Sequence, residues 1–258
     1  MRIFVWAALA AAALAPAALR AECKFEQERT GGESAAGVSR LVLVAAAGEL
    51  EVRGDAKATR VEATGKACAS SQALLDQITL KTRREGSTLF VEVIMPKLND
   101  VTLFGSNSAS LDLRVTLPTT LPVEAQDSSG DAVLEDLKSI KLLDSSGDLT
   151  IRNIAGAVDV RDSSGDIEVE GITGNVEVLV DSSGDIEIEE VSGNVHIAQD
   201  SSGGIELANV KGNVAIDADT SGGIAVRNIG GDFTVAADTN GGIRHDNVTG
   251  RVSLPGVR

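Results

Sequence analysis

The sequence is poor in aromatic residues and in the side chains most often used for catalysis or metal binding. It has no tyrosine, one tryptophan, five phenylalanines, two histidines and two cysteines in 258 residues. A β-helical enzyme that cleaves polysaccharides needs aromatic rings to stack on sugars, and two isolated histidines supply neither a zinc site nor a catalytic triad. We therefore expect no enzyme and no catalytic residue, and a polysaccharide-acting enzyme stays only as an alternative.

Long apolar runs are also scarce, and the one that exists lies at the start of the chain. Ile3 to Leu14 are almost all apolar, Arg2 precedes them, and Ala21 offers a small residue for cleavage before Glu22. The run is too short to span a membrane and is typical of a secretory signal peptide. We predict a signal peptide over residues 1–21, with a retained N-terminal anchor as the alternative. The protein should be exported to the periplasm or the outside, with no membrane insertion after cleavage.

Basic residues are few in comparison with acidic ones. Residues 22–258 contain 21 Lys and Arg against 38 Asp and Glu, and residues 127–258 contain 9 against 24. Such a surface repels nucleic acid and anionic membranes. We expect a protein or cell-surface partner of unknown identity, and no nucleic acid.

The two cysteines, Cys23 and Cys68, both precede the acidic half. An isolated pair in an oxidising compartment most often forms one disulfide. We predict that Cys23 pairs with Cys68, which would stabilise the fold by about 4 kcal/mol on the chain-entropy estimate. Two separate thiols are the alternative.

The second half of the chain repeats a five-residue phrase of the form DSSGD seven times. The copies are 17, 18, 19, 19, 19 and 19 residues apart and begin at Asp127, Asp144, Asp162, Asp181, Asp200, Asp219 and Asp238. A near-constant period of this length is typical of a solenoid in which each copy forms one coil.

Within each copy, apolar and charged residues alternate. Ile167 and Val169 flank Glu168, and Val176 and Val178 flank Glu177. Alternation of this kind predicts two short strands, each with one buried face, and leaves no room for a helix. Consecutive copies should therefore stack as parallel strands about 4.8 Å apart. The predicted fold is all-β, a single-stranded parallel β-helix with coils of 17–19 residues over 127–258.

The N-terminal half, residues 22–126, is a degenerate version of the same pattern. The segment 47–54 (AGELEVRG) aligns with 164–171 (SGDIEVEG), and 60–63 then falls where the second strand of a coil belongs. Further strands are predicted over 78–82, 88–94, 111–117 and 123–125. We expect longer, irregular coils that cap the regular ones, or a small β-layer packed on them.

The signal peptide, the GELEVRG segment and copies such as SSGDIEVEGITGNVEV together resemble the bacterial putative-adhesin family of β-strand-repeat proteins. That family is largely of unknown function and is related to the head domains of auto-transporter adhesins. The resemblance extends from about Arg40 to Leu254. It implies a right-handed β-helix and an adhesin-like role.

Two columns of aspartates are the strongest candidate site. The first consists of the leading Asp of each copy, and the second consists of Asp131, Asp148, Asp166 and Asp185. Calcium held between coils, with Asp162, Asp166, Asp181 and Asp185 as ligands, would relieve the repulsion between stacked carboxylates. Alternatively, each leading Asp accepts hydrogen bonds from the following Ser-Ser-Gly amides on one edge of the stack. We favour this turn, which needs no metal or cofactor and requires a positive φ at the glycine three residues on.

The two histidines fall at different positions in the repeat. His196 takes the outward position of Glu177, and His245 takes the inward position of Val169 in the last copy. His196 should be a solvated surface residue, and His245 should mark fraying or a polar cap at the open end.

These observations favour a non-catalytic, exported β-solenoid that presents an acidic, adhesin-like binding or scaffold surface. One alternative is a calcium-stabilised structural protein of the envelope, and the other is the polysaccharide-acting enzyme. Melting that depends on calcium would favour the first alternative, and turnover of acidic glycans would favour the second.

Overall fold

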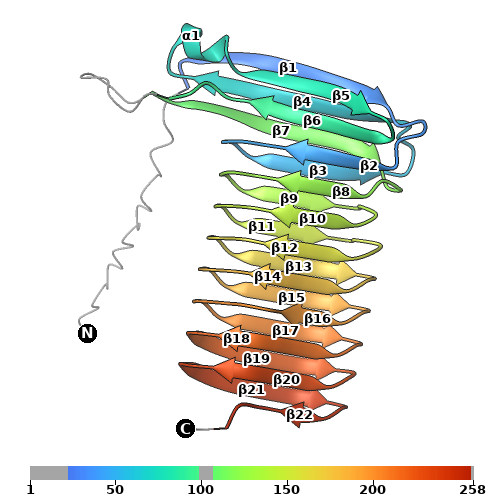
Figure 1. Cartoon of the computed structure of the whole chain (residues 1–258), viewed down its shortest axis with the longest axis vertical. Coiled ribbons are helices and arrows are strands. Elements are labelled where there is room, and N and C mark those ends of the chain that lie inside the picture. The colour runs from blue at the N-terminus through green and yellow to red at the C-terminus, as the bar shows by residue number, and fades with distance from the viewer. Residues whose placement is uncertain (1–22, 99–106, 257–258) are drawn as a thin grey trace, which may run out of the picture.

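The computed structural model describes residues 23–98 and 107–256. The predicted signal peptide lies outside these residues. The chain winds into a tall stack of flattened coils with a wider N-terminal end (Figure 1). Two 11-stranded sheets, here called sheet A and sheet B, form the two walls. This architecture confirms the predicted all-β solenoid.

Sheet A alternates with sheet B along the chain in every regular coil. In spatial order, sheet A contains β1 (Phe25–Ser34), β4 (Arg60–Ala69), β7 (Ala109–Pro118), β3 (Leu50–Asp55), β9 (Ala132–Glu135), β11 (Leu149–Arg152), β13 (Ile167–Ile172), β15 (Ile186–Val191), β17 (Ile205–Val210), β19 (Gly222–Ile229) and β21 (Gly241–Val248). From the opposite end, sheet B contains β22 (Val252–Ser253), β20 (Phe233–Asp238), β18 (Val214–Asp219), β16 (Val195–Ile197), β14 (Val176–Val180), β12 (Val158–Arg161), β10 (Ile140–Leu143), β8 (Val123–Gln126), β2 (Arg40–Val44), β6 (Thr88–Ile94) and β5 (Thr79–Glu85).

The core lies between the two sheets and is built from aliphatic columns that run along the stack. Ile167 and Val169 of β13 pair in parallel register with Ile186 and Ile188 of β15, and all four are buried. Glu168, between the first two, faces outward. Because each aliphatic side chain packs between its copies in the coils above and below, burial belongs to the array and not to a single coil.

A column of glycines lets the turns of successive coils approach closely. Gly184 has a φ of +127°, and a methyl group added there would lie 1.8 Å from the carbonyl oxygen of Gly165. The predicted positive φ is confirmed in six of the seven copies, at Gly130, Gly147, Gly165, Gly184, Gly203 and Gly222.

The N-terminal region changes strand direction and closes that end of the stack. β7 runs parallel to β3 but antiparallel to β4, which in turn pairs antiparallel with β1. β5 and β6 form an antiparallel hairpin in sheet B, and β1 contacts β5 across the end.

Two expectations for this region have different outcomes. The GELEVRG segment does form part of a coil, since Leu50 of β3 pairs in parallel with Ala132 of β9. The segment 60–63 does not form the second strand of that coil, so this expectation is wrong: it begins β4, which lies in sheet A. β4 continues for ten residues in which buried and exposed side chains alternate. It is therefore too long for a coil, in which a strand ends after a few residues and the chain turns toward the other sheet.

A disulfide and a short helix complete this end. Cys23 bonds to Cys68, with their Cα atoms 5.5 Å apart, which confirms the predicted pair. The helix α1 (Gln72–Leu75) has Ser71 as its N-cap and contacts β1 and β4. Arg29 of β1 donates hydrogen bonds to the carbonyl oxygens of Leu75 and Ile78, at 2.9 and 2.8 Å. Of the described helices, none is long and apolar enough to cross a membrane.

We predict that Gly184→Ala destabilises the protein by at least about 2 kcal/mol, because the new methyl group meets a backbone carbonyl that repeats in every coil. Gly242→Ala is the control: a methyl group at Gly242 meets nothing within 4 Å, so its effect should stay within about 0.5 kcal/mol. Chemical denaturation of the two variants measures both values. Equal effects at the two sites would contradict the close stacking of the turns.

Candidate functional site

The leading aspartates of the repeats form a buried column, not the surface edge that the sequence suggested. Six of them are at most 2% exposed: Asp127, Asp144, Asp162, Asp181, Asp200 and Asp219. The in-and-out alternation that buries Ile140 and Leu142 in β10 simply continues to Asp144, which turns this carboxylate toward the interior. Consecutive members pair in parallel, as at Asp181 with Asp200 and Asp200 with Asp219.

Most oxygens of this aspartate column lack a hydrogen-bond donor. Asp127 Oδ1 accepts a hydrogen bond from the Ser128 amide at 2.8 Å, as the predicted turn requires. Both carboxylate oxygens of Asp144, Asp162, Asp181, Asp200 and Asp219 are buried without a hydrogen-bond partner. Only Asp127 thus makes a well-aligned hydrogen bond of the predicted turn, and at the other copies the following Ser amides interact with the carboxylate only in a longer or less aligned geometry.

Burial shifts the protonation of the column toward the neutral acid. It raises the pKa of Asp127 and Asp181 to about 7, and the pKa of Asp144 and Asp200 to about 6. It also raises the pKa of Asp162 and Asp219. Repulsion between neighbours adds to burial, for example from Asp200 on Asp181, whereas the Ser amides that follow each Asp oppose it. Near neutral pH, Asp127 and Asp181 are therefore only partly ionised, whereas Asp144 and Asp200 have already lost most of their protons.

The second aspartate column has a different role. Asp131, Asp148, Asp166 and Asp185 are exposed, and each Oδ1 accepts a hydrogen bond from the backbone N–H at the equivalent position of the next coil. These four bonds are 2.7 to 3.2 Å long and end on Gly204, where the column stops. The second column thus joins consecutive coils through its side chains.

The structure separates the four residues named as possible calcium ligands. Asp162 and Asp181 lie in the buried column. Asp166 and Asp185 are exposed, and each already accepts a hydrogen bond from a backbone N–H of the next coil. Among residues 23–98 and 107–256, no group of three or more His, Cys, Asp or Glu side chains is placed to hold a metal ion. The geometry thus gives calcium no assembled ligand set in the described part of the chain.

Asparagines form two further columns that the sequence analysis overlooked. In one column, Oδ1 of Asn175, Asn194 and Asn213 accepts the backbone N–H of the equivalent residue one coil later, at 2.8 to 2.9 Å. In the other, Asn247 donates to Asn228, and Asn228 donates to Asn209, from positions with φ between 51° and 57°. The recurrence of Gly-Asn every 19 residues, at 174–175, 193–194 and 212–213, was the available signal.

Both histidines occupy their predicted positions. His196 pairs in register with Glu177 and faces outward, where Asp217 at 2.9 Å and Glu177 at 3.4 Å raise its pKa. His245 pairs with Val226 on the inward column but is exposed, because it belongs to the outermost strand of sheet A. Its ring lies 6.3 Å from that of Phe233.

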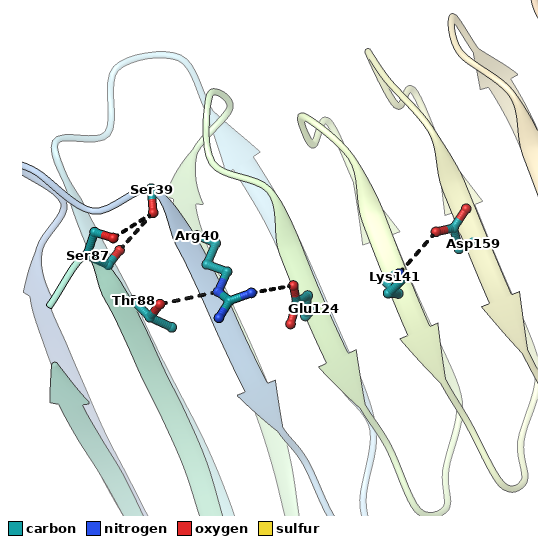
Figure 2. A network of polar contacts seen from close by, with 7 residues as sticks. All are labelled: Ser39, Arg40, Ser87, Thr88, Glu124, Lys141 and Asp159. Carbon is teal, nitrogen blue, oxygen red and sulfur yellow. Dashed lines mark hydrogen bonds and ion pairs between the residues drawn. The ribbon is translucent and has the colours of Figure 1, made fainter. Parts of the chain in front are cut away.

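The outer face of sheet B is largely balanced in charge. Figure 2 shows its N-terminal part, where Arg40 pairs with Glu124 at 2.9 Å and Lys141 pairs with Asp159 at 3.6 Å. Arg40 also donates to the Thr88 hydroxyl (Figure 2). Farther along, His196 lies between two carboxylates as described above. Most acidic side chains of this face thus have a basic neighbour.

The outer face of sheet A carries the unbalanced acidic charge. Arg152 pairs with Glu168 at 2.6 Å and Glu170 at 3.5 Å, and Arg227 pairs with Glu189. Glu187 and Glu206, which stack in register on β15 and β17, have no ion pair with any described residue. This acidic face, defined as the outer side of β13, β15 and β17, is the largest departure from charge balance on the two walls.

A groove of about 1070 Å³ lies on sheet A where β1, β4 and β7 meet β3 and β9, and β11 separates it from the acidic face. Ion pairs between neighbouring strands cross its floor: Lys66 with Glu26 at 3.0 Å and Arg114 with Glu51 at 2.6 Å. The basic side chains of the groove are therefore already paired, and the groove offers no group singled out for catalysis.

Comparison with known protein families identifies the family of this chain. The model of the Toastrack DUF4097 family matches residues 39–251. The protein belongs to this family. The match confirms the resemblance inferred from the repeats and extends over the solenoid and most of its N-terminal cap. None of the proteins of curated function matches the chain.

Solved structures that resemble this chain come from several bacterial species. One is a putative adhesin from Bacteroides fragilis, with 14% identity, a TM-score of 0.47, and coverage of 90% of this chain and 98% of that one. Another is a putative cell adhesion protein from Clostridium sporogenes, with 14% identity, a TM-score of 0.35, and coverage of 89% and 99%. A third is a putative lipid binding protein from Parabacteroides distasonis, with 15% identity, a TM-score of 0.40, and coverage of 90% and 98%.

We predict that the free energy of unfolding falls as the pH rises from about 4 to about 7. An unfolded Asp titrates near 3.9, whereas burial raises the pKa of Asp181 in the folded protein to about 7. The folded state therefore binds more protons between these values, so the stabilisation is complete below the lower pKa and is lost by the upper one. Denaturation at a series of pH values measures this slope.

The variant Asp181→Asn isolates the contribution of the column. Its neutral amide should raise stability at pH 8 by about 1–3 kcal/mol and reduce the pH slope. Asp185→Asn, at an exposed position of the second column, is the matched control and should leave the slope unchanged. An Asp181→Asn variant that is less stable than the parent at pH 8 would show that the carboxylate is ionised and fully hydrogen-bonded.

Removal of divalent cations at about pH 5 should leave the melting temperature unchanged, because protons then neutralise the buried column. The measurement compares melting in a chelator with melting in millimolar calcium. A rise of many degrees with calcium would instead favour the calcium-stabilised alternative and would identify Asp162, Asp166, Asp181 and Asp185 as the residues to substitute next.

Proposed function

We propose that the protein is a non-catalytic, exported surface or envelope protein that binds a partner through the acidic face of sheet A. The observation that carries this proposal is the pair of stacked, unbalanced carboxylates at Glu187 and Glu206, set against a charge-balanced sheet B. A binding face needs a surface that differs from the rest of the molecule. Of the two walls of the stack, sheet A provides it.

The chemistry of this face favours a partner with positive charge. Glu170, Glu187 and Glu206 are all exposed and lie on three neighbouring strands about 4.8 Å apart. Glu187 and Glu206 stack in register, and Glu170 lies farther along the same face, in register with Glu189. A rigid cluster of like charges attracts a basic protein segment or a cationic surface group from a distance. It repels nucleic acid and anionic lipid for the same reason. The N-terminal disulfide suits an oxidising compartment, either the periplasm or the outside of the cell.

Catalysis finds less support in the described residues. Within each column the carboxylates repeat from coil to coil, so no single acid and base pair differs from its copies, and the buried column has no access to a substrate. The groove on sheet A has its cations paired within the protein.

We predict that the triple variant E170Q/E187Q/E206Q binds its partner about tenfold more weakly, because it removes the two unpaired charges at Glu187 and Glu206 and the exposed carboxylate of Glu170, which Arg152 only partly neutralises. The mature protein, immobilised, would be exposed to envelope extract of its own organism at increasing salt, with bound proteins identified by mass spectrometry. The control D159N/E177Q/D217N removes the same charge from sheet B and should retain the same partner as the parent. Equal losses in both variants would show that net charge, and not the acidic face, controls binding.

A further inference from the structure

The N-terminal end of the stack is capped, whereas the opposite end exposes the edges of its last strands. At the N-terminal end, the contact of β1 with β5, the helix α1 and the Cys23–Cys68 disulfide cover the core. At the other end, β21 and β22 are the outermost described strands of their sheets, and each is paired on one side only. The core residues Ile243 and Val248 of β21 are only partly buried, whereas Ile224 and Ile229, their counterparts one coil earlier, are 1% exposed.

The two edge strands at this end are protected to different degrees: β22 is only two residues long and is followed by Pro255, whereas β21 is long and only its charged and polar side chains blunt its edge. Natural edges are blunted by lysines, prolines or bulges, or are covered by another segment. β21 is eight residues long and contains neither lysine nor proline. Its unpaired backbone groups therefore remain available to another strand.

The charge of the last coil also permits close approach of a second molecule. Residues 181–199 contain five acidic residues and no Lys or Arg, whereas residues 238–256 contain two Asp and two Arg. The strongly acidic coils lie several strand spacings away, so salt screens much of their repulsion at the end of the stack. Two copies can thus meet end to end where they would repel side to side.

The order of charges within β21 is self-complementary. Arg244 and Asp246 both point outward, flank His245, and have no ion pair with any described residue. If two β21 strands pair antiparallel about a two-fold axis at His245, Arg244 of each copy faces Asp246 of the other. Moving the two-fold axis by one residue either way, which shifts the register by two residues, places Arg244 opposite Arg244 or Asp246 opposite Asp246, which is unfavourable. The charges therefore select one register.

We infer that the open end is a self-association surface, at which β21 pairs antiparallel with β21 of a second copy of this chain about a two-fold axis at His245. The contact is isologous and closes at two copies, because the capped N-terminal ends point away from each other. This inference is independent of the proposed function, since the acidic face of sheet A stays free on both copies.

A charge swap on the whole mature chain tests the pairing. Sedimentation at about 0.15 M salt, where repulsion between the acidic coils is screened, and at increasing protein concentration should show a monomer–dimer equilibrium for the parent. Arg244→Asp and Asp246→Arg should each weaken dimerisation about tenfold or more, because each replaces two attractive contacts by two repulsive ones. The double variant R244D/D246R restores opposite charges in the same register and should dimerise like the parent.

Matched controls separate this result from loss of folding. Arg161→Asp makes the same charge change at an exposed position in the middle of sheet B and should dimerise like the parent. Recovery in the double variant would also show that the single variants fold. A parent that stays monomeric throughout, or dimers that persist equally in both single variants, would overturn the inference.

Discussion

Every coil of this protein must repeat the backbone path of the coil before it, because the hydrogen bonds between coils form only in register. The Gly165 amide donates to the Ser183 carbonyl at 3.0 Å, and the Ile167 amide donates to the Asp185 carbonyl at 2.8 Å. The same requirement forces the turn glycines so close together that no side chain fits at Gly184. Side chains at equivalent positions of successive coils must therefore stack on one another. The columns of aliphatic, Asp and Asn residues all result from this in-register backbone.

Stacking has opposite consequences for different side chains. An Asn column gains a hydrogen bond at every step, since its amide group both donates and accepts, as between Asn228 and Asn247. A column of Asp carboxylates gains nothing when ionised, because two charges about 4.8 Å apart repel by about 3–4 kcal/mol at an effective dielectric constant of 20. Protonation removes this repulsion. The buried Asp column thus makes the interior sensitive to pH, whereas the walls respond to salt.

The period of the repeat and its alternation predicted the regular coils down to individual residues, including the outward position of His196 and the inward one of His245. The same alternation also assigns Asp144 to the interior, where the structure places it. The sequence analysis instead placed the leading aspartates on an edge of the stack, because a charged side chain is normally exposed. The arrangement of the N-terminal cap was harder to predict from the sequence. β2 and β3 precede β8 and β9 in the sequence by about eighty residues yet lie beside them, and no local pattern marks that β4 reverses direction. The acidic face could be predicted as a charge excess, but its restriction to sheet A depends on which carboxylates find a basic partner.

The reversal of strand direction at β4 also bears on how such a protein changes length in evolution. The cap contacts only the first coils, and every later coil contacts its two neighbours alone. Duplicating or deleting one unit of 19 residues would therefore alter the height of the stack by about 4.8 Å and leave all remaining contacts as they are. The height of the stack can therefore change only in steps of one coil, while the N-terminal cap and the last coil stay the same. A solenoid built in this way can change its length without redesign of either end.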